Sequence, residues 1–232
     1  MNEWTIKSTM EDSQMNTISR LDLLKNINKS NTITLNNKVL DSINTNEEYY
    51  LQYLKLDTTS WARDIFHFKS GKEHYRFLIY MSLHFNGCDI FELGTYGGES
   101  ALAMSSNPSN QIYTFDIVKT YSQELSKNKN NIHFHIEDIM EHPEHHEKLL
   151  SSSFIFLDTV HDGKTEKRFY DFLITNNYKG ILCMDDVCHT SYPELHSVWN
   201  NIETSKIDVT KYGHETGTGL VIFNNEIEFK LE

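Results

Sequence analysis

The stretch Asp89-Ile-Phe-Glu-Leu-Gly-Thr-Tyr-Gly-Gly-Glu-Ser-Ala-Leu-Ala-Met104 decides the fold of this chain. Ile90–Leu93 reads as a short buried strand, and the residues after the glycines read as the start of a helix. Between them, Glu92, Gly94 and Gly98 stand in an E-x-G-x-x-x-G spacing. Glycines here let the backbone approach a ligand closely, and the helix points its free N–H groups at the same place. The pattern predicts a cofactor-binding turn at the carboxyl end of a strand.

Tyr96 separates this turn from the dinucleotide-binding fingerprint. The G-x-G-x-x-G pattern needs a second glycine two residues after the first, and Tyr96 stands there after Gly94. The spacing therefore disfavours a Rossmann dehydrogenase.

Short apolar runs alternate with helical stretches along the rest of the chain. The strand candidates are Ile90–Leu93, Ile112–Phe115, Ile132–Ile136, Phe154–Leu157 and Ile181–Met184. The helix candidates lie near 70–85, 98–106, 120–127, 143–151, 164–176 and 191–202. This alternation predicts parallel pairing in a doubly wound α/β sheet. Two last strand-like runs, Gly219–Phe223 and Glu226–Lys230, flank Asn224-Asn225 and predict an antiparallel hairpin.

The first part of the chain differs in character from the rest. Residues 1–48 are polar and rich in Asn, Ser and Thr, and residues 47–68 hold clustered aromatic side chains. We expect an N-terminal arm and helical cap over residues 1–69, followed by one domain over residues 70–232. At this stage the arm is either a partly ordered extension or a lid or dimerisation element.

Length, charge and cysteine usage limit the function classes. The 232 residues suffice for one α/β domain with a sizeable core. The net charge of -12 disfavours a nucleic-acid partner, because such binding depends on Lys and Arg. The three cysteines form no C-x-x-C pair, which favours a reducing compartment. With no apolar run near the roughly 20 residues of a membrane span and no signal-peptide core, we expect a cytoplasmic protein without a membrane partner.

Acidic residues follow two neighbouring strand candidates. Asp158 comes directly after Phe154–Leu157, with His161 three residues later, and Asp185 and Asp186 follow the next candidate. One strand–helix–strand crossover separates the two sets, so we expect them at the same edge of the sheet. Converging carboxylates repel one another unless a cation lies among them, and oxygen ligands suit Mg²⁺ or a similar hard ion.

These motifs resemble those of known enzymes. The stretch from Asp89 to Met104 resembles motif I of the class I S-adenosylmethionine (SAM) methyltransferases. The pattern Asp158-x-x-His161 with Asp185-Asp186, within roughly residues 60–223, resembles the catechol-type O-methyltransferases and the cephalosporin-hydroxylase-like group with its macrolide sugar O-methyltransferases. The resemblance implies the Rossmann-like class I methyltransferase fold, in which an antiparallel hairpin closes a mostly parallel sheet. One departure is that the second group often has Glu where this chain has Asp185, and the shorter arm would shift the metal or change its coordination number.

The resemblance implies SAM as the cofactor. Asp116, after Ile112–Phe115, would accept hydrogen bonds from both ribose hydroxyls, and Asp138 or its neighbour Glu137 would contact the adenine amino group. Glu92 would lie under the methionine end. The expected cofactor-binding residues are Glu92, Gly94, Thr95, Tyr96, Gly98, Ser100, Asp116 and Asp138.

The resemblance also implies O-methylation of a sugar or another small hydroxylated molecule. Asp158, Asp185 and Asp186 would hold a divalent metal, Mg²⁺ in the first instance, that lowers the pKa of the acceptor hydroxyl. Asp158 and His161 are the expected catalytic residues, with His161 as the general base. His189 and His214 are the candidates for contact with the acceptor, and relatives suggest a homo-oligomer.

Two other functions share these motifs. One is an enzyme of the same fold with different chemistry, as the hydroxylase name of some relatives warns. The other is a non-catalytic SAM-binding protein, which the intact acidic trio and His161 disfavour. The run His142-Pro-Glu-His-His146 has the composition of a metal tract, but we expect a solvated helix start away from the metal.

Overall fold

The computed structural model describes residues 32–44, 72–120, 128–224 and 226–232. The predicted arm up to residue 31, the aromatic residues of 47–68, the first two residues of the helix expected at 70–85, and residues 121–127 of the helix expected at 120–127 lie outside these residues. The strands are β1 (Thr32–Leu35), β2 (Asp89–Leu93), β3 (Gln111–Asp116), β4 (Ile132–Ile136), β5 (Phe154–Leu157), β6 (Ile181–Asp185), β7 (Lys206–Asp208), β8 (Thr218–Ile222) and β9 (Glu228–Leu231). The helices are α2 (Asn37–Asn44), α5 (Lys72–His84), α6 (Glu99–Met104), α8 (His146–Ser151), α9 (Lys164–Thr175) and α10 (Pro193–Asn201), with short 3₁₀ turns η2 (Ile139–Glu141) and η3 (Pro143–His145).

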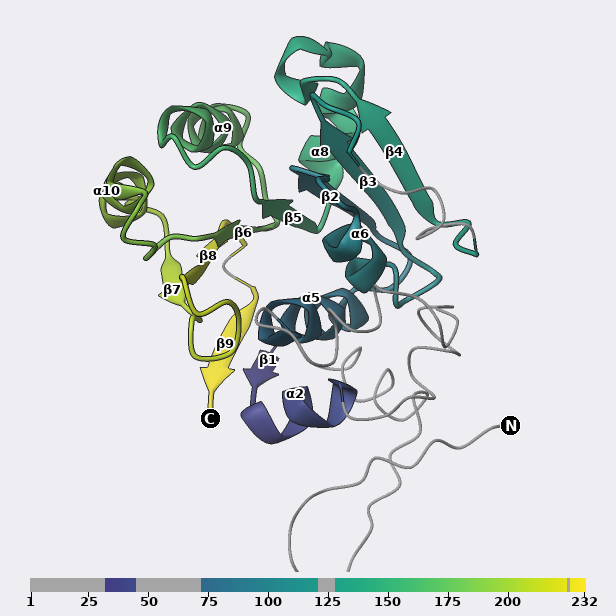
Figure 1. Ribbon diagram of the computed structural model, residues 1–232, viewed down its shortest axis with the longest axis vertical. Coiled ribbons are helices and arrows are strands. Elements are labelled where there is room, and N and C mark those ends of the chain that lie inside the picture. The colour runs from purple at the N-terminus through teal and green to yellow at the C-terminus, as the bar shows by residue number, and fades with distance from the viewer. Residues whose placement is uncertain (1–31, 45–71, 121–127, 225) are drawn as a thin grey trace, which may run out of the picture.

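The main sheet has the strand order β4-β3-β2-β5-β6-β8-β7 (Figure 1). Strands β2 to β6 pair in parallel. From β2 the chain builds outward through β3 to β4, and then returns to β5 on the other side of β2. This reversal between β2 and β5 is the topological switch point, where open α/β sheets bind ligands. The predicted Rossmann-like, doubly wound and mostly parallel sheet is confirmed.

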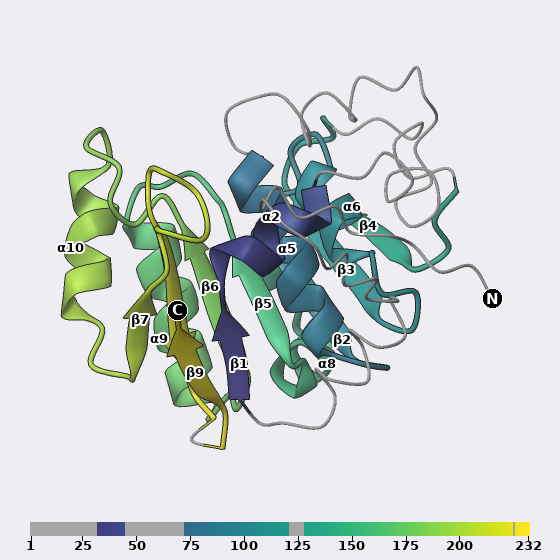
Figure 2. The same cartoon turned by 90° about the horizontal axis from the view of Figure 1, so that it is seen from below.

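Helices cover both faces of this sheet (Figures 1 and 2). One core contains side chains of α2, α5 and α6, and the other contains side chains of α8, α9 and α10. Successive residues of a strand enter opposite cores: Ile181 and Cys183 of β6 face α5, whereas Leu182 and Met184 face the other layer. By the same alternation, Asp185 faces α5.

The antiparallel end of the sheet differs from the predicted hairpin. Strand β8 pairs antiparallel with β6 and with β7, a short strand that the sequence pattern did not indicate. The predicted partner of β8, residues 226–230, instead contributes to β9, which pairs in parallel with β1 in a separate two-stranded sheet. The pairing of Gly219–Phe223 with Glu226–Lys230 was therefore wrong. Every residue of β8 is buried, whereas β9 is mostly exposed, so β9 lacks the apolar faces of an inner strand.

Residues 32–44 pack against the main domain. Ile33 and Leu35 of β1 and Leu40 of α2 are buried in the same core as α5. The Tyr80 hydroxyl of α5 donates to the Thr34 carbonyl oxygen, which ties β1 to the helix. In Figure 2, β1 and β9 lie side by side on the α5 side of the main sheet. This part of the predicted arm covers one face of the sheet, while the domain boundary at residue 69 stays a prediction.

Two further expectations concern the whole chain. None of the helices among the described residues combines the length and apolar character needed to cross a membrane. Cys88, Cys183 and Cys188 are free thiols, of which Cys183 is buried and Cys88 is half-buried.

Candidate active site at the switch point of the sheet

The turn between β2 and α6 requires glycine at two positions. Gly94 has a φ of +97°, and a Cβ there would lie 1.7 Å from the Asp158 carbonyl oxygen of the neighbouring strand. Gly98 has a φ of 90° and precedes α6, and its N–H donates to the Thr95 carbonyl oxygen at 2.8 Å. Tyr96, between them, holds a positive φ of 41° and leaves 77% of its surface exposed. The predicted strand–turn–helix is therefore present, with β2 and β5 in close contact below it.

Glu92 lies wholly inside the molecule beneath this turn. Its side chain is 0% exposed, and the Thr114 hydroxyl donates to its Oε2 atom. Its Oε1 atom has no hydrogen-bond partner among the described residues. Burial raises the pKa of Glu92 to about 8, against the opposing effect of the Ser100 and Thr114 hydroxyls. A pKa of about 8 favours the protonated carboxyl at neutral pH.

Asp116 and Asp138 end consecutive parallel strands, or follow them closely, at the same sheet edge. The Asp116 carboxylate accepts from the Tyr96 N–H at 2.9 Å and from the Val118 N–H at 3.0 Å. A carboxylate has about four lone-pair positions, so both oxygens can still accept hydroxyl donors. Asp138 caps η2 by accepting from the Met140 N–H at 2.9 Å. Both residues therefore position the loops as well as presenting acceptors.

A pocket of about 320 Å³ opens at this edge. Its wall includes the predicted Gly94, Tyr96, Asp116, Asp138 and Asp158. Apolar side chains supply other parts of the wall; they include Ile117, Ile139, Met140, Val160 and Phe169. The volume falls at the low end of the range for small-molecule sites, which are mostly apolar with a few placed polar groups. The structure thus brings four of the predicted acidic and glycine positions of the turn and strand ends to one cavity.

The register of β5 and β6 brings the second acidic set together. Leu157 pairs with Met184, so Asp158 and Asp185 leave adjacent strands side by side. Burial raises the pKa of Asp158, with the Asp185 charge adding to the effect against the hydrogen bond of His161. Asp158 also lines the pocket, so it belongs to both the cavity and the acidic cluster.

His161 lies between two of the three carboxylates. Its Nε2 atom is 3.3 Å from Asp158 Oδ1 and 3.6 Å from Asp186 Oδ2. Burial lowers its pKa, but the hydrogen bond and charge of Asp158 and the charge of Asp186 outweigh burial, so the pKa is raised. His161 and Asp186 both hold left-handed backbone conformations, with φ of 58° and 57°. Such strain in residues other than glycine is characteristic of functional sites.

His214 contacts the other side of the acidic pair. Its Nδ1 atom is 3.3 Å from Asp185 Oδ2, 3.4 Å from Asp186 Oδ1 and 2.9 Å from the Thr216 hydroxyl. Hydrogen bonds to Asp185 and Asp186 raise the pKa of His214 to about 10. Burial opposes the ionisation of Asp186, yet hydrogen bonds from His214 and Thr216 lower its pKa overall. His214 thus lies among the carboxylates, and its contact with the acceptor stays a prediction.

Two residues of this site were missed in the sequence. Glu166 of α9 is 2% exposed and accepts hydrogen bonds from the Thr159 hydroxyl at 2.7 Å and the His161 N–H at 2.9 Å. It therefore holds the strained turn that carries His161. His74 of α5 is 6% exposed, and its Nδ1 atom is 3.5 Å from Asp185 Oδ1. The only feature of the sequence that could have indicated Glu166 or His74 is that each is a polar residue in a helix expected to pack on the sheet.

His189 has a local role in this structure. Its Nδ1 atom accepts from the Ser191 N–H at 3.1 Å, and its ring lies 4.6 Å from that of Tyr192. The same Tyr192 ring is 4.7 Å from the His161 ring, so Tyr192 contacts both histidines and connects His189 to the site.

The His-rich run forms a second cluster at the edge of the sheet. The Glu137 carboxylate is 2.7 Å from His145 Nε2, 3.4 Å from His135 Nδ1 and 3.5 Å from His142 Nδ1. All four side chains remain partly exposed. As expected, the run begins a helical stretch after β4, formed by η3 and α8. Glu137 of this cluster also lines the pocket that contains Asp158.

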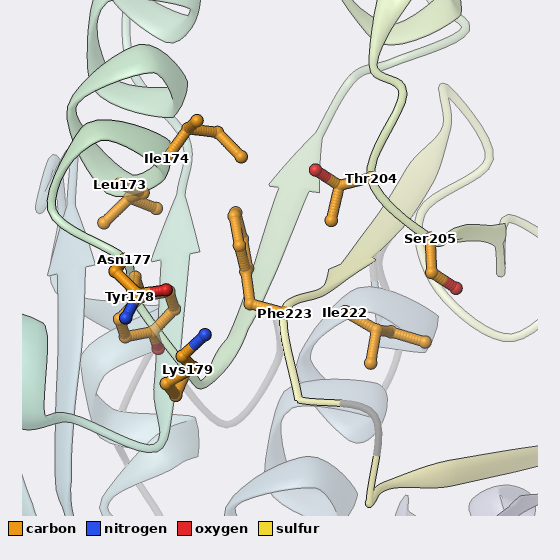
Figure 3. Close-up of a pocket in the computed structure, with 9 residues that line it drawn as sticks. All are labelled: Leu173, Ile174, Asn177, Tyr178, Lys179, Thr204, Ser205, Ile222 and Phe223. Carbon is orange, nitrogen blue, oxygen red and sulfur yellow. The ribbon is translucent and has the colours of Figure 1, made fainter.

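A second cavity of about 220 Å³ lies where α9 ends and β6 begins (Figure 3). Figure 3 shows the Phe223 side chain projecting between the α9 side and Thr204. None of the predicted site residues lines this cavity, and Lys179 is the only charged residue among the described residues that line it.

No protein-family model and no curated protein matches the chain. Solved structures with a similar backbone include a SAM-dependent O-methyltransferase from Thermotoga maritima, with TM-score 0.47, 12% identity and 69% of each chain covered. They also include an SAH-bound methyltransferase from Podospora anserina, with TM-score 0.45, 16% identity and coverage of 77% of this chain and 87% of that chain. A Streptococcus mutans protein described as a SAM-dependent methyltransferase has TM-score 0.44 and 11% identity over 64% of this chain, which spans only 47% of that protein. Similarity at this level carries no argument about function, so the function must be argued from the site.

Proposed function

We propose that this chain is a SAM-dependent O-methyltransferase acting on a small hydroxylated molecule, such as a sugar. The observation that carries the proposal is the shared position of Asp158. It lines the pocket with Gly94, Asp116 and Asp138, and it also contacts His161 in the acid–histidine cluster. A methyl donor in the pocket and a proton acceptor in the cluster would therefore lie next to each other.

The pocket wall suits a nucleoside. Asp116 would accept hydrogen bonds from the ribose hydroxyls, and Ile117, Ile139 and Met140 provide apolar surface for a base. Asp138 would accept from the exocyclic amine of adenine. The Gly94 turn allows the backbone to approach the amino-acid end of the cofactor, above Glu92.

His161 would remove the proton from the acceptor hydroxyl. Its Nε2 atom faces Asp158 and Asp186, which favours a proton on that nitrogen and leaves Nδ1 to accept the substrate proton. When bound, SAM would supply the methyl group to the deprotonated acceptor oxygen, and the electron pair of the broken carbon–sulfur bond would stay on sulfur in a neutral thioether. Glu166, which holds the His161 N–H, would position the base.

The donor set fits a divalent cation. Asp185 Oδ1 is buried without a hydrogen-bond partner among the described residues, beside Asp158 and Asp186, the other predicted ligands. When bound, the cation would neutralise the carboxylates and lower the pKa of the acceptor hydroxyl. Mg²⁺ is the ion that the sequence predicts.

Calorimetric titration of the chelator-stripped protein with SAM tests the proposal. We expect SAM to bind, and Asp116→Asn to weaken binding at least about 10-fold, because a hydrogen bond to a charged group contributes about 1.5–3 kcal/mol. Asp171→Asn, on the exposed surface of α9, is the matched control and should leave the affinity unchanged. An absence of SAM binding to the wild-type protein would overturn the assignment. Binding without turnover on any sugar or catechol acceptor would favour a non-catalytic SAM-binding protein.

A further inference from the structure

Asp185 lies between two imidazole rings that belong to different elements. Its Oδ1 atom is 3.5 Å from His74 Nδ1 on α5, and its Oδ2 atom is 3.3 Å from His214 Nδ1 in the loop before β8. One ligand atom from each of the three residues lies within 4.8 Å of the other two. The two imidazole rings are 5.3 Å apart. Two nitrogens and one carboxylate thus converge on one point.

Two of these atoms are buried and unsatisfied. The side chains of His74 and Asp185 are 7% and 6% exposed, yet neither His74 Nδ1 nor Asp185 Oδ1 makes a hydrogen bond to any described residue. A buried polar atom without a partner costs about 1–3 kcal/mol. The Phe156 ring, 5.2 Å from the His74 ring, limits the access of water on one side. A cation bound by both atoms satisfies both.

The other two carboxylates of the predicted trio are engaged differently. Asp158 and Asp186 face His161, and Asp186 also accepts from the Thr216 hydroxyl. Within the trio, Asp185 alone has an oxygen that is both buried and unpartnered among the described residues. The residues that surround Asp185 are therefore better candidates for the metal ligands than Asp158 and Asp186 are.

We infer that His74, Asp185 and His214 bind a divalent transition metal of the Zn²⁺, Co²⁺ and Fe²⁺ kind. Imidazole nitrogen suits these ions, whereas Mg²⁺ prefers oxygen ligands alone. Two histidines and one carboxylate leave further coordination positions open for water or an acceptor oxygen. The inference rests on the proposed function for the use of those positions, but metal binding is measurable without cofactor or acceptor.

The test is a titration of the chelator-stripped, full-length protein with Co²⁺ and with Mg²⁺, followed by calorimetry and by visible absorption of bound Co²⁺. We expect Co²⁺ to bind at least about 10-fold more tightly than Mg²⁺. His74→Gln keeps a polar side chain but removes the imidazole. It should weaken Co²⁺ binding at least about 10-fold, the smallest loss usual even for a residue that only supports a ligand. Mg²⁺ affinity should change little.

His145→Gln is the matched control. The His135, Glu137 and His145 side chains form the other group of three ligand atoms within 4.8 Å among the described residues, and they would also take Co²⁺. His145→Gln should remove that binding and leave the His74-dependent absorption band intact. His214→Gln, in a half-buried loop position, provides a second variant should His74→Gln fail to fold.

The outcomes separate this inference from the proposed function. If neither His74→Gln nor His214→Gln changes Co²⁺ affinity or its absorption band, the inference is wrong. It is also wrong if Mg²⁺ binds as tightly as Co²⁺. SAM affinity, measured on the same samples, should be unchanged in His74→Gln because His74 does not line the pocket. A protein that binds Co²⁺ through His74 but never binds SAM would support the metal site and overturn the methyltransferase assignment.

Discussion

Glu92→Gln should make the protein more stable at mildly alkaline pH. The wild-type carboxyl is wholly buried, and its pKa is raised to about 8 from an ordinary 4.5. Between these values the folded protein keeps a proton that the unfolded chain releases. Because its pKa is raised in the folded protein, protonated Glu92 contributes stability that is fully present below pH 4.5. This contribution is lost as pH rises toward 8. Glutamine resembles the protonated acid, keeps an acceptor for the Thr114 hydroxyl, and has no proton to lose.

The magnitude follows from the two pKa values. A difference of one pH unit corresponds to about 1.36 kcal/mol, so the free energy of unfolding should change by up to about 5 kcal/mol between pH 4.5 and pH 8. Wild type and Glu92→Gln should therefore have similar stability near pH 4.5, and the variant should be several kcal/mol more stable near pH 8.

Urea unfolding of both proteins without SAM, over this pH range, measures the difference. Glu147→Gln, at an exposed position of α8, is the control and should show no such divergence. Parallel stability curves for wild type and Glu92→Gln would refute the reasoning, because they would mean that Glu92 ionises freely in the folded protein. A variant that is less stable at every pH would show instead that the amide cannot replace the carboxyl among Ser100 and Thr114.

Three further predictions concern the turn, the base and acid stability. Gly94→Ala should lower the free energy of unfolding in urea by at least about 3 kcal/mol, because the new Cβ would meet the backbone oxygen of Asp158. Gly87→Ala is the control: Gly87 has a φ of +69° but open space around it, so the loss should be only about 1–2 kcal/mol. His161→Gln should lower turnover about 10²–10⁴-fold while SAM affinity measured by calorimetry stays the same, and equal turnover would remove His161 as base. Burial lowers the pKa of His84 to about 4, so the stability contributed by the neutral ring is lost as pH falls from 6.5 toward 4. The free energy of unfolding should therefore fall less between these two pH values in His84→Gln than in the wild type, by about 2–3 kcal/mol.

The sheet and the positions of its strand ends were predictable because they depend on local patterns. Buried runs of four to six residues between helical stretches mark parallel strands, and the glycine at position 94 marks the tight turn after the first of them. Acidic residues directly after such strands must meet at one edge of the sheet. Asp116, Asp138, Asp158 and Asp185 were found at that edge for this reason.

The missed features depend on contacts between distant segments. The pairing of β9 with β1 joins residues 32–35 to residues 228–231, and neither strand has an apolar pattern strong enough to reveal a partner. The three-residue strand β7 is too short for any periodicity to show. Glu166 was missed because its partner is a backbone N–H in the preceding turn, and a backbone donor leaves no mark in the sequence.

The contact between His74 and Asp185 bears on the one departure of this chain from the sequence pattern of the group that it resembles. Glu is frequent at the position of Asp185 in the group that the sequence resembles, and the difference alone predicted a shifted metal or a changed coordination number. The alternation of β6 turns this side chain toward α5, where the His74 ring packs against Phe156. A glutamate there would extend one carbon farther toward a ring whose Nδ1 atom is already 3.5 Å from the carboxylate. The shorter aspartate leaves room for an imidazole. Under the inference that His74, Asp185 and His214 bind a metal, the departure from the group's pattern and the buried histidine belong to one ligand set.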